Sequence, residues 1–285
     1  MPAPSLTQRV PAQLFIVGSA LVQYVGAAIA VAAFAQMEPA SVAWWRVVTG
    51  AVVLLAWRRP WRDGLTRADL WRSAVFGVVL TCLNSSFYEA IARLPLGTAV
   101  SLEFLGPVLV AVVRGRGWAP RVAAVLAFAG VASIGGLGLD LSDRRTLVGV
   151  AWILTAAVMW AGYIMLGQKI ASQRSGVTNL ALGCFFGAVV FAPITGRGGM
   201  AVLGDWRLFV IVVAVGLLST VLPYTLEALA MARLSAATFA LFTAMLPATS
   251  AIVGAVMLRQ MPGLGELIGL VLISAAVWIA SRPEA

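Results

Sequence analysis

Five ionisable side chains lie within or close to long apolar stretches of this 285-residue sequence, and their types could do chemistry there. They are Arg46, Glu89, Glu103, Glu227 and Glu266. A charge at the centre of a bilayer costs about 2.5–3.5 kcal/mol even on the lenient insertion scale, so such side chains usually face a cavity or a partner. Their positions within the apolar stretches predict different roles.

Two of the five have local explanations. Glu266 falls in the first turn after Pro262, where an acid complements the positive end of a helix. Glu89 lies four residues before Arg93, which is the spacing of a surface ion pair on a helix. We expect both glutamates to have structural roles.

Glu103 is the best candidate for a functional carboxyl group. It lies about eight residues, or roughly 12 Å, into its apolar stretch, and this depth places it near the bilayer centre. Desolvation there favours the neutral carboxyl, so proton uptake and release become available. Arg46 lies at a comparable but shallower depth from the same side. The two could form a buried ion pair, or they could bind substrate or a proton.

Glu227 ends a stretch rich in hydroxyl groups, residues 219–227, which predicts a bent polar helix facing a cavity. Further hydrogen-bonding side chains could bind substrate or hold helices together. These are Gln23, Asn84, Trp160, Tyr163, Thr220 and Tyr224. Pro107 and Pro247 lie in the middle of their stretches, where each removes a helical hydrogen bond and creates a hinge or a structural kink.

The composition requires lipid as the solvent, because 61% of residues are hydrophobic and only 11% are charged, with a mean hydropathy of +0.96. The absence of histidine excludes histidine-based zinc sites, catalytic pairs and proton relays. No phosphate-binding loop occurs, and no metal or cofactor is expected. Cys82 and Cys184 lie inside apolar stretches, where a disulfide is not expected. The pI near 10.9 reflects arginines between the stretches and does not indicate nucleic-acid binding.

Ten apolar stretches must position these side chains, and each is long enough to predict a membrane span. They cover residues 14–34, 40–57, 72–92, 96–113, 119–139, 147–167, 178–194, 207–231, 236–258 and 263–281. The first is too long for the core of a signal peptide. With a cytoplasmic N-terminus, thirteen Arg and Lys residues fall in inside connections and six in outside ones. This bias places both termini in the cytoplasm.

The sequence repeats at a spacing of 140 residues. Seven residues between 90 and 111 recur between 230 and 251: Ala90, Ala92, Arg93, Leu94, Thr98, Pro107 and Ala111 recur as Ala230, Ala232, Arg233, Leu234, Thr238, Pro247 and Ala251. We therefore expect two five-helix halves, residues 1–139 and 147–285. Because each half has an odd number of helices, the second is inverted. Inverted repeats place substrate between the halves and work by alternating access.

The pairs Gly183/Gly187 and Gly265/Gly269 predict close helix packing within the chain, or a contact in a homodimer.

Several of these segments resemble one known family. Residues 95–107 are similar to the fourth helix of the threonine/homoserine exporter branch of the drug/metabolite transporter superfamily, whose members carry paired EamA-type repeats, and residues 218–227 are similar to its eighth helix. Residues 160–163 with 167–169, and Arg46 ahead of residues 60–62, resemble its sixth and second helices. The chain departs from this pattern at Leu246 and at Arg259-Gln260, where the branch carries acids.

This resemblance implies a ten-helix basket that exports small amino acids, with a cavity lined mainly by helices one, three, four, six, eight and nine. The expectation is an inner-membrane, proton-coupled secondary transporter for a threonine- or homoserine-like substrate. Export of drugs or other metabolites is the alternative within the superfamily. An intramembrane enzyme and a non-transporting scaffold are the alternatives from other classes.

Overall fold

The computed structural model describes residues 11–114, 117–134, 139–171, 176–231 and 244–280. Within these ranges the regular elements are helices, and no strand occurs. Six helices are long and apolar enough to cross a membrane, and four shorter apolar helices accompany them. The predicted all-helical membrane class is confirmed.

The helices follow the predicted stretches closely. Their bounds are α2 (Ala12–Ala33), α3 (Pro39–Arg58), α4 (Arg67–Ile91), α5 (Leu96–Glu103), α6 (Leu105–Arg114), α7 (Ala119–Ser133), α8 (Arg144–Ala171), α9 (Gly176–Gly199), α10 (Trp206–Gly216), α11 (Leu222–Met231), α13 (Leu246–Leu258) and α14 (Leu264–Ala280). A π-helical turn, Leu217–Val221, joins α10 to α11. Residues 236–243 of the ninth stretch, and Ala232, Arg233, Leu234 and Thr238 of the repeat, lie outside the described residues.

Local sequence signals explain several helix ends. A capping box of Thr66 and Asp69 begins α4, and the Asp205 carboxylate accepts backbone N–H bonds at the start of α10. At the start of α8, hydrogen bonds from the backbone N–H of Arg145 and from Thr146 lower the pKa of Asp143, outside the membrane-spanning segments. These contacts satisfy N–H groups that the first helical turn leaves unpaired.

Pro107 lies just after an interruption of its span. It has no N–H to donate to the carbonyl of Glu103 four residues earlier, and the helix breaks at Phe104 into α5 and α6. Glu103 is therefore the last residue of α5. Pro247 lies in the first turn of α13, immediately after the turn at residues 244–245. The stretch that would precede this turn in a longer helix is outside the described part of the chain.

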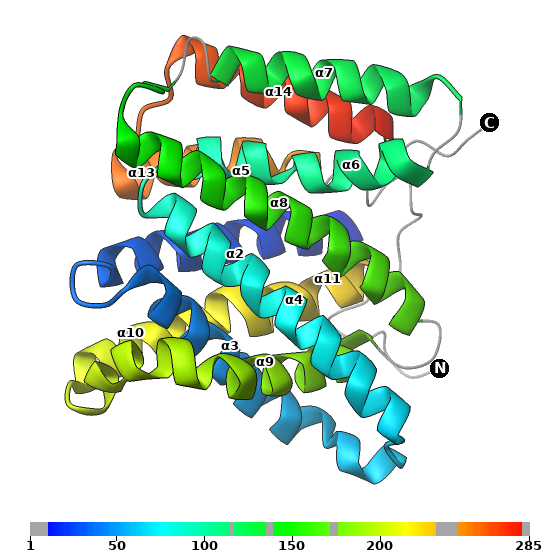
Figure 1. Cartoon of the computed structure of the whole chain (residues 1–285), viewed down its shortest axis with the longest axis vertical. Helices are drawn as coiled ribbons and strands as arrows, with labels where there is room; N and C mark the ends of the chain where they lie inside the picture. Colours follow the sequence, from blue (N-terminus) through cyan, green and yellow to red (C-terminus); the bar gives the residue numbers. More distant parts are fainter. Residues whose placement is uncertain (1–10, 115–116, 135–138, 172–175, 232–243, 281–285) are drawn as a thin grey trace.

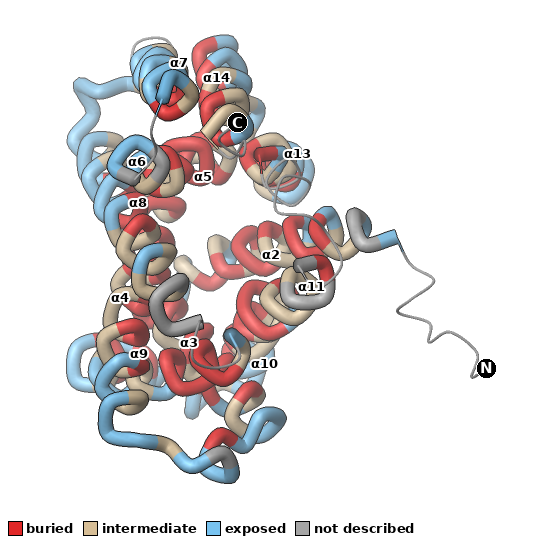
Figure 2. Tube along the Cα trace, turned by 90° about the vertical axis from the view of Figure 1, so that its right-hand side faces the viewer, coloured by how far each residue is buried: buried red, intermediate tan, exposed pale blue. Residues whose placement is uncertain are grey.

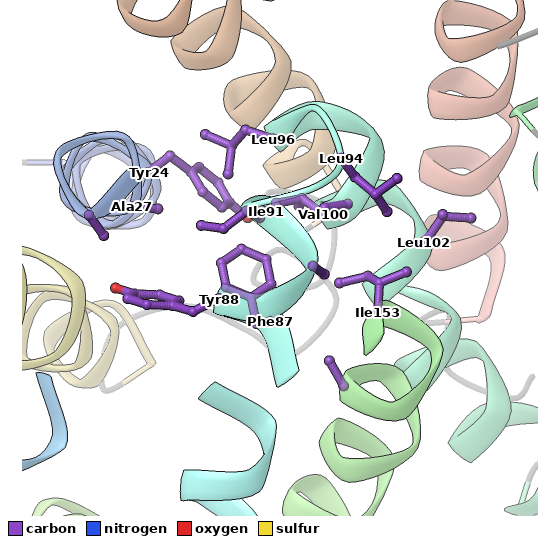
Figure 3. Packing of buried hydrophobic residues seen from close by; sticks show 14 of the residues in the cluster. Tyr24, Ala27, Phe87, Tyr88, Ile91, Leu94, Leu96, Val100, Leu102 and Ile153 are labelled. Atoms are coloured by element: carbon purple, nitrogen blue, oxygen red, sulfur yellow. The ribbon is translucent and has the colours of Figure 1, made fainter. Parts of the chain in front are cut away.

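The helices stack in tiers, with α7 beside α14 at one end and α3, α9 and α10 at the other (Figure 1). Between them, buried side chains from different helices meet, such as Tyr24 of α2, Ile91 of α4, Val100 of α5 and Ile153 of α8 (Figure 3). The centre of the molecule is thus built from helices of both halves of the chain.

Glycines allow the closest helix contacts. A Cβ atom on Gly77 of α4 would collide with the Gly183 carbonyl of α9, and one on Gly187 would collide with Thr81 of α4. On the other pair, a Cβ on Gly269 would collide with Ile134 next to α7. The small-residue pairs thus pack helices within one chain, as predicted.

The two glutamates with predicted structural roles have them. Arg93 Nη1 lies 2.5 Å from Glu89 Oε2, and the other Glu89 oxygen accepts the Ala40 N–H at the start of α3. Glu266 accepts the Gly263 N–H at 2.8 Å and a hydrogen bond from the Thr98 hydroxyl of α5. Glu266 therefore caps α14 and also ties it to α5.

Candidate functional site

Six side chains from five helices form a group that we call the central cluster. They are Tyr24 of α2, Arg46 of α3, Glu103 of α5, Tyr163 of α8, and Tyr224 and Glu227 of α11. Each lies within electrostatic range of at least one other member. Viewed along the helices, these elements surround the middle of the molecule and turn buried faces toward it (Figure 2). The cluster contains one cation and two acids.

Arg46 is only 5% exposed and is held on two sides. Its Nε donates to the Thr220 hydroxyl at 2.9 Å, and its Nη2 donates to the Ser219 carbonyl at 2.6 Å. Its guanidinium lies over the ring of Tyr88, 5.6 Å from the centroid. Its Nη1 has no hydrogen-bond partner among the described residues. Arg46 is therefore fixed in orientation and keeps donors for a further anion.

Glu103 faces the same region from the broken end of α5. Its side chain is partly exposed and accepts no hydrogen bond from the described residues. It attracts the Arg46 guanidinium, but no nitrogen–oxygen pair of the two comes within the 4.0 Å of a salt bridge. Of the two predicted arrangements, the structure therefore lacks the direct ion pair. It holds the two charges apart.

Glu227 is bonded on the other side of the cluster. The Ser19 hydroxyl of α2 donates to Glu227 Oε1 at 2.9 Å. Tyr163 and Tyr224 lie within electrostatic range of each other and of Glu227. This side of the cluster therefore brings polar groups of α2, α8 and α11 together.

The remaining predicted residues differ in their placement. Asn84 is buried and its Nδ2 donates to the Leu80 carbonyl of its own helix at 2.9 Å. Trp160 packs edge-on against Phe104, beside Glu103, with ring centroids 4.7 Å apart. Gln23 is partly exposed, and its backbone carbonyl accepts a bond from the Ser219 hydroxyl. The Thr220 hydroxyl accepts a hydrogen bond from Arg46. Asn84 thus serves its own helix, whereas Thr220 belongs to the site.

Sequence reasoning missed Tyr24, Ser19 and Tyr88. Tyr24 lies within electrostatic range of both Glu103 and Glu227, Ser19 bonds to Glu227, and Tyr88 supports Arg46. The available signal was a polar group inside an apolar stretch, and Tyr24 directly follows Gln23. That signal does not say which side of a helix faces the centre.

The cluster brings side chains of both charges to one region of the molecule. An unpaired charge buried in protein costs several kcal/mol. A buried cation and separate acids therefore favour a ligand that offers a negative group to the cation and a positive group to an acid. The tyrosine hydroxyls add further hydrogen-bond donors and acceptors.

Comparison with known proteins identifies related transporters. Residues 147–282 match the EamA-like transporter family. The threonine/homoserine exporter RhtA of Escherichia coli (strain K12) is 34% identical over 250 residues, which cover 88% of this chain and 84% of that protein. The RhtA of Salmonella typhimurium (strain SL1344) is 33% identical over 261 residues, which cover 90% and 88%. These relatives are named as transporters and not as enzymes.

More distant proteins also match most of this chain in sequence or in fold. An uncharacterized transporter of Archaeoglobus fulgidus is 23% identical over 87% of this chain and 90% of its own length. A crystal structure of a protein with 18% identity superposes with a TM-score of 0.60 over 94% of this chain and 96% of that chain, which indicates a shared fold. With an identity of 34% to an exporter over most of both chains, this chain belongs to the EamA-like transporter family of the drug/metabolite transporter superfamily.

Proposed function

We propose that this protein exports a small amino acid with a side-chain hydroxyl group, such as threonine or homoserine, from the cytoplasm across the bacterial inner membrane. The observation that carries the proposal is the separation of Arg46 from Glu103 and Glu227 within the central cluster. The carboxylate of the substrate binds Arg46, and its ammonium binds an acid. The identity to exporters named for threonine and homoserine supports this substrate class.

The proposal includes proton coupling through the acids of the cluster. Neither Glu103 nor Glu227 is in a salt bridge with a described residue. A carboxyl group without a contacting cation can bind a proton or a substrate ammonium in turn, because each neutralises the same charge. Exchange of the two at Glu103 would link proton entry to substrate exit.

Alternating access between two inverted halves is also part of the proposal, with residues 1–139 and 147–285 as the repeats and ten helical spans in all. Two pairs of helices that would be equivalent pack on each other: α3 on α9, and α7 on α14. Across the last pair, a Cβ on Gly130 would meet Ile273, and a Cβ on Gly269 would meet Ile134. Such reciprocal contacts are those that an approximate two-fold axis produces.

The inverted arrangement predicts the topology of the chain. A reporter fused after Ala285 should be active in the cytoplasm, and one inserted at Gly204, between α9 and α10, should be active outside the membrane. The reason is the excess of Arg and Lys in the inside connections. Paired alkaline phosphatase and fluorescent-protein fusions measure the two sides. Finding both sites on the same side would contradict the inverted repeat.

Flux in proteoliposomes tests the function directly. Purified protein should move labelled threonine or homoserine down a concentration gradient of that amino acid. It should also move the amino acid against its concentration gradient when an opposing proton gradient is imposed. Empty liposomes and liposomes with heat-denatured protein are the controls. Movement of an organic cation or aromatic compound, with no amino acid transported, would favour the drug-exporter alternative. Absence of flux for every compound would favour a scaffold, and chemical conversion of a substrate would favour an enzyme.

A further inference from the structure

Pro223 occupies an unusual place in α11, the helix that carries two of the six cluster residues. It is buried, it is the second residue of α11, and it follows the π-helical turn Leu217–Val221 directly. Within this turn the Leu222 N–H bonds back to Leu217, five residues earlier, instead of the usual four. Insertions of this kind are frequent at functional sites.

The absence of an N–H on Pro223 has a specific consequence. In an α-helix that N–H would bond to the carbonyl four residues earlier, which is the carbonyl of Ser219. This carbonyl instead accepts the Nη2 of Arg46 at 2.6 Å. A bond from a guanidinium is charge-assisted and stronger than a bond between neutral groups. The proline therefore leaves an acceptor available where Arg46 uses it.

The π-helical turn packs closely against α2 and α3. A Cβ on Gly26 of α2 would collide with Ser219, and one on Gly50 of α3 would lie 2.9 Å from Thr220 Cγ2. Ser219 thus packs against α2, and Thr220 packs against α3. The Thr220 hydroxyl gives Arg46 its second bond from the same turn. The turn and the guanidinium are consequently fixed relative to each other.

We infer that Pro223 is a positioning residue, which reserves the Ser219 carbonyl for Arg46 and so aims the remaining guanidinium donors at the substrate carboxylate. This inference rests on the proposed role of Arg46 in substrate binding. It assigns a function in substrate affinity to a residue that itself need not touch the substrate. A proline that only bends the helix would have no such effect.

Pro223→Ala distinguishes a role in positioning Arg46 from a role in bending the helix. Only the positioning role predicts weaker substrate binding in a protein that is at least as stable as the wild type. The variant supplies an N–H that competes with Arg46 for the Ser219 carbonyl. The helix gains a hydrogen bond, since alanine is a far better helix former than proline. Thermal unfolding of the variant should therefore occur at the same or a higher temperature, while substrate binding should weaken.

The experiment measures threonine flux in proteoliposomes for the wild type, Pro223→Ala and a matched control, Pro193→Ala. Pro193 is a second proline inside a helix, exposed on α9, and the carbonyl four residues before it belongs to Val189, not to a partner of Arg46. Pro223→Ala should raise KM by about tenfold, the scale expected for a hydrogen bond to a charged group, and change the maximal rate by less than about twofold. Pro193→Ala should leave KM unchanged.

A second measurement does not depend on transport. Phenylglyoxal modifies accessible guanidinium groups, and mass spectrometry of the peptide that contains Arg46 gives its labelling rate. We expect faster labelling of Arg46 in Pro223→Ala than in the wild type and in Pro193→Ala. An unchanged labelling rate, or an unchanged KM in a protein that transports threonine, would overturn the inference. Faster labelling in a protein that transports no amino acid would support the positioning role and refute the proposed function.

Discussion

Arg46→Ala is expected to reduce the initial rate of threonine export at least about 30-fold, because removing one partner of a buried charged contact costs about 2 kcal/mol or more. The substrate carboxylate would then enter the cluster without a cation to meet it. Proteoliposome flux with labelled threonine measures the loss. Cells that overproduce the wild type should also tolerate more external threonine or homoserine than cells that overproduce the variant.

Two further arginine variants show whether the effect belongs to the site. Arg207→Ala removes an exposed guanidinium that lies beside Trp206 at the start of α10, and it should transport normally. Arg46→Lys keeps the charge but lacks the planar fork that bonds Ser219 and Thr220 together, so an intermediate rate is expected. A folded Arg46→Ala protein with the wild-type rate would remove Arg46 from the substrate site.

Glu103→Gln is expected to abolish the response of transport to a proton gradient. Glutamine has nearly the same size and remains neutral at every pH, so it can neither take up nor release a proton. Because Glu103 accepts no hydrogen bond and forms no salt bridge with a described residue, the substitution breaks no such contact of the fold. Flux should fall to the rate that the wild type shows without a gradient. Proteoliposomes with and without an imposed pH difference measure it.

Glu89→Gln is the matched control, because Glu89 is the acid already bonded to Arg93 near the end of α4. Its gradient response should be retained. A normal gradient response in Glu103→Gln would restrict Glu103 to a structural role. Loss of the response in Glu227→Gln alone would transfer proton coupling to the other acid of the cluster, which Ser19 contacts.

Features that depend on residues close together in the chain could be predicted from the sequence. The long apolar stretches predicted the helices, since lipid requires every backbone group to bond within its own segment. The spacing of Glu89 and Arg93 predicted their ion pair, and Pro262 ahead of Glu266 predicted the helix cap. The break after Glu103 followed from Pro107 in the same way. Each of these contacts spans four residues or fewer.

Which side chains meet at the centre could not be predicted from the sequence, because it depends on contacts between distant segments. The partners of Arg46 lie 173 and 174 residues away in sequence, and Ser19 lies 208 residues from Glu227. Helices in a membrane are apolar toward lipid and toward one another, so the pattern of residues gives little information about the rotation of each helix. That rotation is set by packing, such as the glycine contacts that press α2 and α3 onto Ser219 and Thr220. For this reason the Asn84 side chain bonds within its own helix, whereas Tyr24 lies in the central cluster.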